Sequence, residues 1–68
     1  MTCFYDWLMT QRDRDDPIGD LANDAISDPK APKRGSVETW RTYLVRAPGA
    51  CHQALEALED AIWEFQGQ

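Results

Sequence analysis

The adjacent residues Cys51 and His52, with Cys3 at the other end of the chain, have side chains that could bind a metal or attack a substrate. A closed zinc site needs four ligands, usually with two in a close Cys-x-x-Cys spacing, and this sequence meets neither condition. Cys51 and His52 also make a poor nucleophile and base, because adjacent residues on a helix point about 100° apart. We therefore expect no metal, no cofactor and no enzymatic activity, with both thiols reduced and partly buried.

The acidic run Asp13-Arg14-Asp15-Asp16 is a candidate calcium loop. In an EF-hand register that starts at Asp13, Ile18 stands where the sharp turn needs glycine, and Asp24 stands where a bidentate glutamate is wanted. We expect a solvated turn instead. Asp16 then caps the following helix, with Pro17 at its first position, where a missing N–H costs nothing.

The charge of the chain is unevenly distributed along its 68 residues. The formal net charge of −5 argues against general binding to nucleic acid or to anionic membranes. Residues 30–46 nevertheless hold five cations and one acid, a balance of +4, while the remainder holds two arginines and eleven acids, a balance of −9. This imbalance indicates an interaction with a partner.

Two groups of residues follow from that imbalance. One is a candidate interaction patch of Lys33, Arg34, Arg41 and Arg46. The other is a candidate acidic and aromatic patch of Glu56, Glu59, Asp60, Trp63 and Glu64. Each has a structural alternative. The cations can pair with acids on neighbouring helices, each pair contributing under about 1 kcal/mol. Trp63 can fold back onto the first helix, over Tyr5 or Met9, which we favour in so small a domain.

The elements that must position these residues are helices, because apolar residues recur at helical spacing in four stretches. These stretches are Phe4–Gln11, Ile18–Ile26, Val37–Leu44 and Cys51–Phe65, with proline or glycine in the gaps. The first helix should run from about Thr2 to Gln11. Asp28-Pro29 should end the second, Ser36 should cap the third, and the last should begin near Pro48–Cys51. We predict one all-α domain over residues 1–68, a compact bundle of four to five short helices.

The apolar stripes also predict the core. The expected inward residues are Phe4, Trp7, Leu8, Gln11, Ile18, Leu21, Ala22, Ala25, Ile26, Val37, Trp40, Tyr43, Leu44, Cys51, Ala54, Leu55, Leu58, Ala61, Ile62 and Phe65. The apolar runs are too short to span a bilayer, and the N-terminus has neither a basic leader nor an apolar segment of the kind that directs secretion. With only two cysteines, we expect a cytoplasmic protein.

The chain resembles the YozE-type family of small bacterial proteins with a fold like the sterile alpha motif. The resemblance lies in Phe4-Tyr5-Asp6-Trp7-Leu8, the Ala22…Ala25 helix followed by Asp28, Pro32-Lys33, Tyr43-Leu44 and an aromatic-tailed last helix, and it extends from about Cys3 to Phe65. Two departures affect packing. Ala31 stands where relatives tend to have an aromatic residue, and Ile62 separates Ala61 from Trp63. The resemblance implies a bundle of four or five helices and little about activity.

Taken together, these observations predict a non-catalytic protein-interaction module. Its basic third-helix region and acidic fourth helix would meet opposite charges on a partner protein or on another copy, head to tail. The alternative is nucleic-acid binding through the basic residues 33–46, which would weaken steeply with salt.

Overall fold

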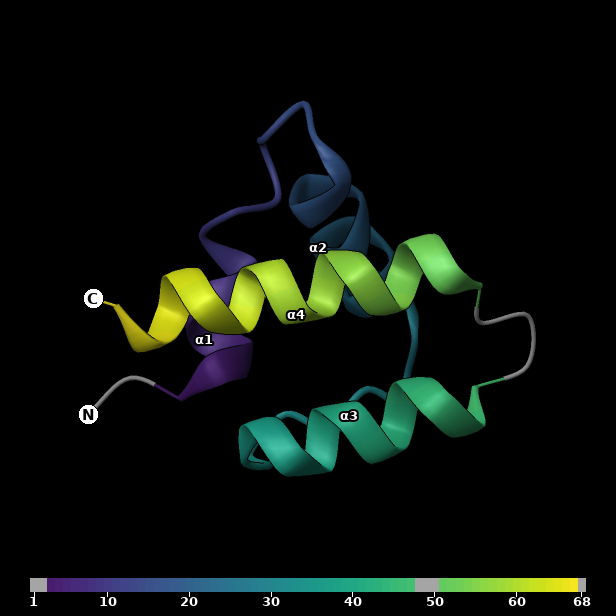
Figure 1. The fold of residues 1–68 in the computed structure, drawn as a ribbon. Helices are drawn as coiled ribbons and strands as arrows, with labels where there is room; N and C mark the ends of the chain where they lie inside the picture. Colours follow the sequence, from purple (N-terminus) through teal and green to yellow (C-terminus); the bar gives the residue numbers. More distant parts are fainter. Residues whose placement is uncertain (1–2, 48–50, 68) are drawn as a thin grey trace.

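Four helices account for the architecture of this protein (Figure 1). The computed structural model describes residues 3–47 and 51–67, and no strand occurs among them. The helices are α1 (Phe4–Met9), α2 (Pro17–Ser27), α3 (Val37–Arg46) and α4 (His52–Gln66). The longest, α4, crosses the molecule between α2 and α3 and also contacts α1 (Figure 1). The predicted all-α fold is confirmed.

The starts of α2 and α3 follow from their capping residues. The carboxylate of Asp16 accepts a hydrogen bond of 3.0 Å from the backbone N–H of Gly19, and Pro17 occupies the first helical turn. The hydroxyl of Ser36 accepts one of 3.3 Å from the backbone N–H of Thr39. Both predicted caps are confirmed, since each side chain satisfies an N–H that has no partner within its helix.

The first helix is shorter than predicted, because it ends at Met9 rather than Gln11. The hydroxyl of Thr10 donates to the carbonyl of Trp7, and the backbone N–H of Gln11 donates to the carbonyl of Leu8. Such bonds, three residues apart, tighten the last turn and end the helix. The expected start at Thr2 and the break at Pro48-Gly49 lie outside the described residues.

The core forms where α4 meets the other three helices. Its largest fully buried side chains are Trp40, Phe4, Leu8, Leu58 and Ile62. The Phe4 ring lies edge-on to that of Trp40, with 5.3 Å between ring centroids, and edge-on to that of Phe65, at 5.4 Å. Such aromatic contacts contribute energy beyond the burial of area, which matters in a domain with little interior.

Two residues predicted in the core stripes are exposed. Cys51 is the N-cap of α4 and has an extended backbone, so helical spacing does not apply to it. Ile26 lies eight residues after Ile18, which at about 100° per residue places it about 80° round the helix. It is therefore at the edge of the α2 stripe and 48% exposed. Only Cys3 of the two cysteines is partly buried, and both are free thiols.

Candidate interaction surfaces

Arg41 does not belong to a free basic patch, because it joins α3 to α4. Its Nε lies 2.9 Å from Oε2 of Glu59 and its Nη2 lies 3.0 Å from Oε1. Its Nη1 also donates to Glu38, one turn earlier on α3. The hydrogen bonds from Arg41 lower the pKa of Glu59. The alternative expectation, that cations of the basic patch pair with acids within the fold, is therefore confirmed for Arg41. The same contact occupies Glu59, which no longer counts as a free member of the acidic patch.

The other cations of residues 30–46 are Lys30, Lys33, Arg34 and Arg46, which we call the cationic surface. All four are exposed, and none forms an ion pair with an acidic residue in the part of the chain that the structure describes. The first three lie in the segment between α2 and α3, and Arg46 lies in the last turn of α3. The structure thus leaves Lys33, Arg34 and Arg46 of the predicted basic patch free and adds Lys30.

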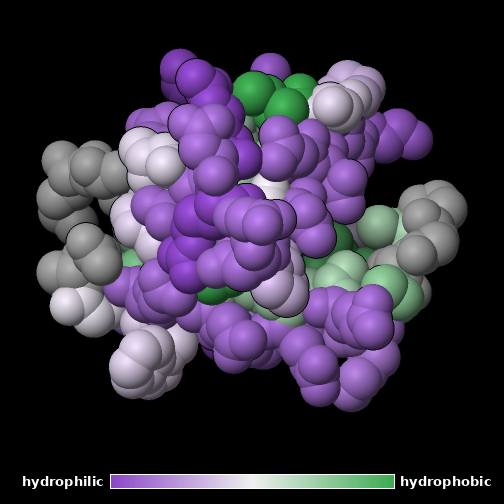
Figure 2. Space-filling view, turned by 90° about the horizontal axis from the view of Figure 1, so that it is seen from above, coloured by the Kyte–Doolittle hydropathy of each residue, from purple (hydrophilic) through white to green (hydrophobic). Residues whose placement is uncertain are grey.

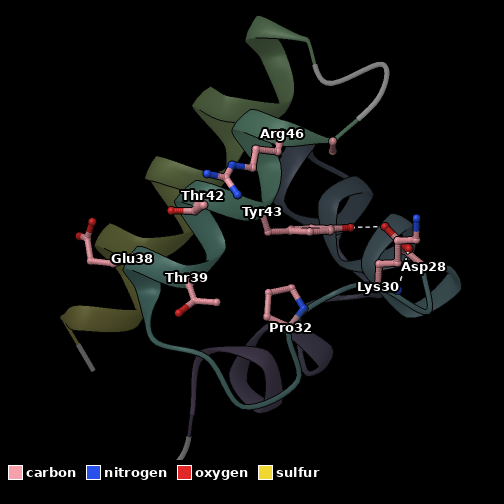
Figure 3. A pocket seen from close by; sticks show the side chains of 9 residues that line it. Asp28, Lys30, Pro32, Glu38, Thr39, Thr42, Tyr43 and Arg46 are labelled. Atoms are coloured by element: carbon pink, nitrogen blue, oxygen red, sulfur yellow. Dashed lines mark hydrogen bonds between the residues drawn. The ribbon is translucent and has the colours of Figure 1, made fainter.

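A groove of about 820 Å³ lies between α3 and the segment that precedes it (Figure 3). We call it the α3 groove, and it is lined by Asp28, Lys30, Pro32, Glu38, Thr39, Thr42, Tyr43, Arg46 and Ala47. Figure 3 shows Tyr43 extending from α3 toward Asp28, with the ring of Pro32 beside it. The sequence predicted Tyr43 as an inward residue, and it is half-buried as one wall of this groove.

The hydroxyl of Tyr43 donates a hydrogen bond to the carboxylate of Asp28, which also accepts one of 2.9 Å from the backbone N–H of Lys30. Burial and then the contact with Asp28 raise the pKa of Tyr43 to about 12. The same hydrogen bond is the main cause of a lowered pKa at Asp28. At neutral pH the groove therefore holds an ionised Asp28 and a neutral Tyr43 in a fixed arrangement.

Part of the predicted acidic patch also serves the fold. Glu64 accepts hydrogen bonds from two nitrogens of Arg14, at 2.8 and 3.2 Å, and Arg14 also pairs with Asp16. These bonds lower the pKa of Glu64 and tie the end of α4 to the turn before α2. Glu56 lies 2.9 Å from the exposed His52 on the same helix. Arg14 was predicted only as part of a solvated turn.

A second groove, of about 510 Å³, lies between α2 and α4 and is bordered by carboxylates. Asp20 and Asp24 come from α2, and Glu56 and Asp60 come from α4, while Leu21, Ala54 and Ala57 supply apolar surface. We call it the acidic groove. Sequence reasoning missed Asp20 and Asp24 as site residues. Asp20 and Asp24 are four residues apart, as are Glu56 and Asp60, and this spacing places each pair on one helix face. The spacing was the feature of the sequence that could have predicted them as site residues.

Trp63 is 78% exposed, so the favoured expectation that it folds back onto α1 is wrong. At about 100° per residue, Trp63 points about 180° away from Ala54, which is on the core side of α4. Tyr5 stacks instead on Trp40, at 6.3 Å between centroids. Trp63 borders a hollow of about 280 Å³ together with Asp60. The face of the molecule seen in Figure 2 is largely hydrophilic, with hydrophobic residues in separate small areas.

The described residues contain no group that fits a bound metal. Within residues 3–47 and 51–67, no three His, Cys, Asp or Glu side chains come together in a way that could hold an ion. No described helix is both long and apolar enough to cross a membrane. His52 is exposed, and its Nε2 lies 2.9 Å from Oε1 of Glu56 on the same helix.

These features define a small all-α domain whose distinguishing marks are two grooves and an uneven charge distribution. The family model described as the YozE SAM-like fold matches residues 3–67, nearly the whole chain, and the chain belongs to this family. The family is one of small domains of unknown function with no catalytic role assigned to it. No curated protein and no solved structure matches the chain. The resemblance seen in the sequence is thereby confirmed.

Proposed function

We propose that this domain is a protein-interaction module that binds through two oppositely charged surfaces, and that it self-associates head to tail. One is the cationic surface, of which Lys30 and Arg46 line the α3 groove. The other, which we call the acidic surface, consists of the acidic groove and Trp63. The observation that carries the proposal is that internal ion pairs occupy Arg41, Glu59 and Glu64, whereas the described structure gives no ion pair to Lys33, Arg34 and Arg46 on one surface or to Asp20, Asp24 and Asp60 on the other.

The two surfaces lie on different elements, which supports a contact between molecules. The cationic surface belongs to α3 and the segment before it, whereas the acidic surface belongs to α2 and α4. Surfaces of opposite sign steer association and set its orientation. A contact between two different surfaces of the same chain leaves one of each free at the ends, so further copies can add.

Nucleic-acid binding through the cationic surface is less well supported. Arg41, one of the four residues on which that prediction depended, is bonded to Glu38 and Glu59. Asp28 and Glu38 border the α3 groove, where they would face a phosphate backbone. Titration with single- and double-stranded oligonucleotides at low salt tests this alternative. Tight binding with a steep salt dependence would favour it over the protein-interaction proposal.

The cytoplasmic location stays a prediction. The two free cysteines, Cys3 and Cys51, suit a reducing compartment, where thiols are kept from forming disulfides.

Self-association is tested by sedimentation equilibrium and by ¹⁵N-resolved NMR across a concentration series. We expect the average mass to rise with concentration at low salt and to fall when salt is added, because exposed charges are screened. Resonances of residues 30–46 and of the acidic surface should shift together. A chain that stays monomeric at millimolar concentration and low salt would contradict the self-association proposal.

Charge reversal then assigns the surfaces. Arg34→Glu should block the cationic surface, and Asp24→Lys should block the acidic surface. Neither variant should therefore self-associate on its own. A mixture of the two should form a 1:1 complex, because each retains the surface that the other lacks. Arg12→Glu is the matched control. It makes the same charge change at an exposed arginine outside the cationic surface, and we expect it to associate at least as well as the wild type.

A further inference from the structure

The α3 groove has the features of a site for a flat aromatic side chain. Tyr43 and Pro32 are half-buried and offer ring surfaces, and Lys30 and Arg46 stand exposed at the rim (Figure 3). The hydrogen bond from Tyr43 to Asp28 holds the tyrosine ring in place. An aromatic ring that enters such a groove gains ring contacts with Tyr43 and cation–π contacts with the charged rim.

Of the two rim cations, Lys30 interacts electrostatically with the groove's own Asp28, whereas Arg46 forms no ion pair with a carboxylate in the described parts of the chain. Asp28 accepts hydrogen bonds from Tyr43 and from the backbone of Lys30, and Glu38 accepts one from Arg41. Neither carboxylate forms an ion pair with the Lys30 or Arg46 side chain in the described parts of the chain. A ligand that brings a single carboxylate beside its aromatic ring would therefore meet the positive charge of Arg46, with Lys30 as a second cation whose charge is shared with Asp28.

Trp63 and Asp60 are such a combination on this same protein. Trp63 is the most exposed of the large hydrophobic residues on the described surface, at 78%. Asp60 is exposed, stands three residues earlier on α4 and borders the same hollow, so both side chains lie on one side of the helix. Covering a tryptophan of this kind can bury about 150–250 Å².

From this complementarity we infer that Trp63 of one copy inserts into the α3 groove of a second copy, with Asp60 beside Lys30 and Arg46. The inference rests on the proposed function and names its central contact. Trp63 borders a hollow with Arg14, Asp16, Pro17 and Ile18, none of which lines the α3 groove. The contact is therefore made between copies rather than within one chain.

The first test is sedimentation equilibrium of the full chain at low salt with the variant Trp63→Ser. The substitution is at an exposed position, so the fold should be retained. We expect the dissociation constant of self-association to rise at least about tenfold, as for an aromatic residue at the centre of an interface. Val45→Ser is the matched control, because Val45 is 68% exposed on α3 and does not line the groove. It should change the constant by no more than about twofold.

The second test locates the partner of Trp63. ¹⁵N-labelled Trp63→Ser keeps its groove and is mixed with unlabelled Lys30→Glu/Arg46→Glu, which keeps its tryptophan. Resonances of Thr42, Tyr43 and Arg46 in the labelled chain should shift and reach saturation at a 1:1 ratio. An unlabelled chain that carries all three substitutions should produce no shifts.

The outcomes separate this inference from the proposed function. If the wild type and Trp63→Ser self-associate equally, the inference is wrong and the head-to-tail proposal stands. If Trp63→Ser weakens association but the groove resonances of the labelled chain do not respond, Trp63 binds elsewhere and the inference is again wrong. If the wild type does not self-associate at all, both fail together.

Discussion

Arg41 of α3 and Glu59 of α4 meet in a two-bond contact, with Nε 2.9 Å from Oε2 and Nη2 3.0 Å from Oε1. Arg14 and Glu64 make the equivalent contact between the turn before α2 and the end of α4. These pairs divide the charged residues of the chain into two sets. One set joins elements that are distant in sequence, and the other lies on the surface without such a contact in the described parts of the chain.

The first prediction concerns acid stability. Contacts with Arg41 and Arg14 lower the pKa values of Glu59 and Glu64 in the folded state. A lowered folded pKa contributes stability that is present above the unfolded pKa and is lost as the pH falls through the folded value. The urea midpoint of the wild type should therefore drop between about pH 5 and pH 3. In Glu59→Gln/Glu64→Gln the midpoint should be lower at pH 7, and its fall on acidification should be smaller.

Glu56→Gln is the control for this experiment. It makes the same chemical change at an exposed carboxylate whose partner, His52, is on the same helix. Its pH profile should follow that of the wild type. An equally steep acid transition in the double variant would show that these two pairs are not its source.

The second prediction concerns alkaline stability. The pKa of Tyr43 is raised to about 12 by burial and by its contact with Asp28. A phenol with a raised folded pKa contributes stability that is complete below its unfolded value near 10 and is lost as the pH rises through the folded value. The wild type should lose stability between about pH 10 and pH 12, measured by urea unfolding. Tyr43→Phe should lack this part of the loss and should be less stable at pH 7 by under about 1.5 kcal/mol.

The ultraviolet titration of tyrosinate gives a separate check on Tyr43. The difference between the wild type and Tyr43→Phe reports the ionisation of this one residue. A transition near pH 10 in that difference would contradict the burial of Tyr43 and its contact with Asp28, because an unperturbed phenol titrates there.

Local features of the fold were predictable from the sequence, because their causes lie within a few residues. Asp16 and Ser36 each cap a backbone N–H three residues later, and Pro17 suits the start of α2. Apolar spacing likewise located most of the core. It failed for Cys51, which precedes its helix, and for Ile26, which lies at the edge of a stripe.

The candidate surfaces were predictable only in part, because they depend on how the helices pack. The pairing of Arg41 with Glu59 spans 18 residues, and that of Arg14 with Glu64 spans 50. Charge counting cannot distinguish such a pair from two free charges. The packing of α2 against α4 likewise determines that Asp24 joins Asp60 in one groove.

The third prediction concerns Trp40, which is fully buried and whose Nε1–H has no acceptor among the described residues. A buried donor without a partner costs about 1–3 kcal/mol, and Trp40→Phe removes that cost along with part of the packing. We therefore expect this variant to lose only about 1–2 kcal/mol in urea unfolding. Leu58→Ala, also fully buried, should lose about 2–5 kcal/mol because it only creates a cavity.

Trp7→Phe is the matched control for Trp40→Phe. Trp7 is also buried. Its indole N–H differs from that of Trp40, because it is not both fully buried and without an acceptor. The same substitution there brings no compensating gain and should cost more. If Trp40→Phe proves the more costly of the two, the packing lost at Trp40 outweighs the relief of its unpaired N–H, and the prediction is wrong.

The fourth prediction concerns Gly19, where α2 passes close to the preceding turn. A Cβ at this position would lie 2.0 Å from the carbonyl oxygen of Arg14 and 2.8 Å from its carbonyl carbon. Gly19→Ala gains up to about 1 kcal/mol in helix propensity but must push the backbone of Arg14 aside, at a cost of about 1–3 kcal/mol. We expect a net loss of stability in urea unfolding. The displaced Arg14 should also weaken its contact with Glu64, which would shift the Glu64 amide resonance.

Gly67→Ala separates this overlap from the general effect of replacing glycine. A Cβ at Gly67 would meet only ordinary contacts, the nearest at 3.5 Å from the Trp63 carbonyl oxygen. That variant should be neutral or gain up to about 1 kcal/mol, since alanine restricts the unfolded chain more than glycine does. A stabilised Gly19→Ala would mean that the Arg14 backbone can move away freely. The turn that holds Arg14 against Glu64 would then not be fixed by α2.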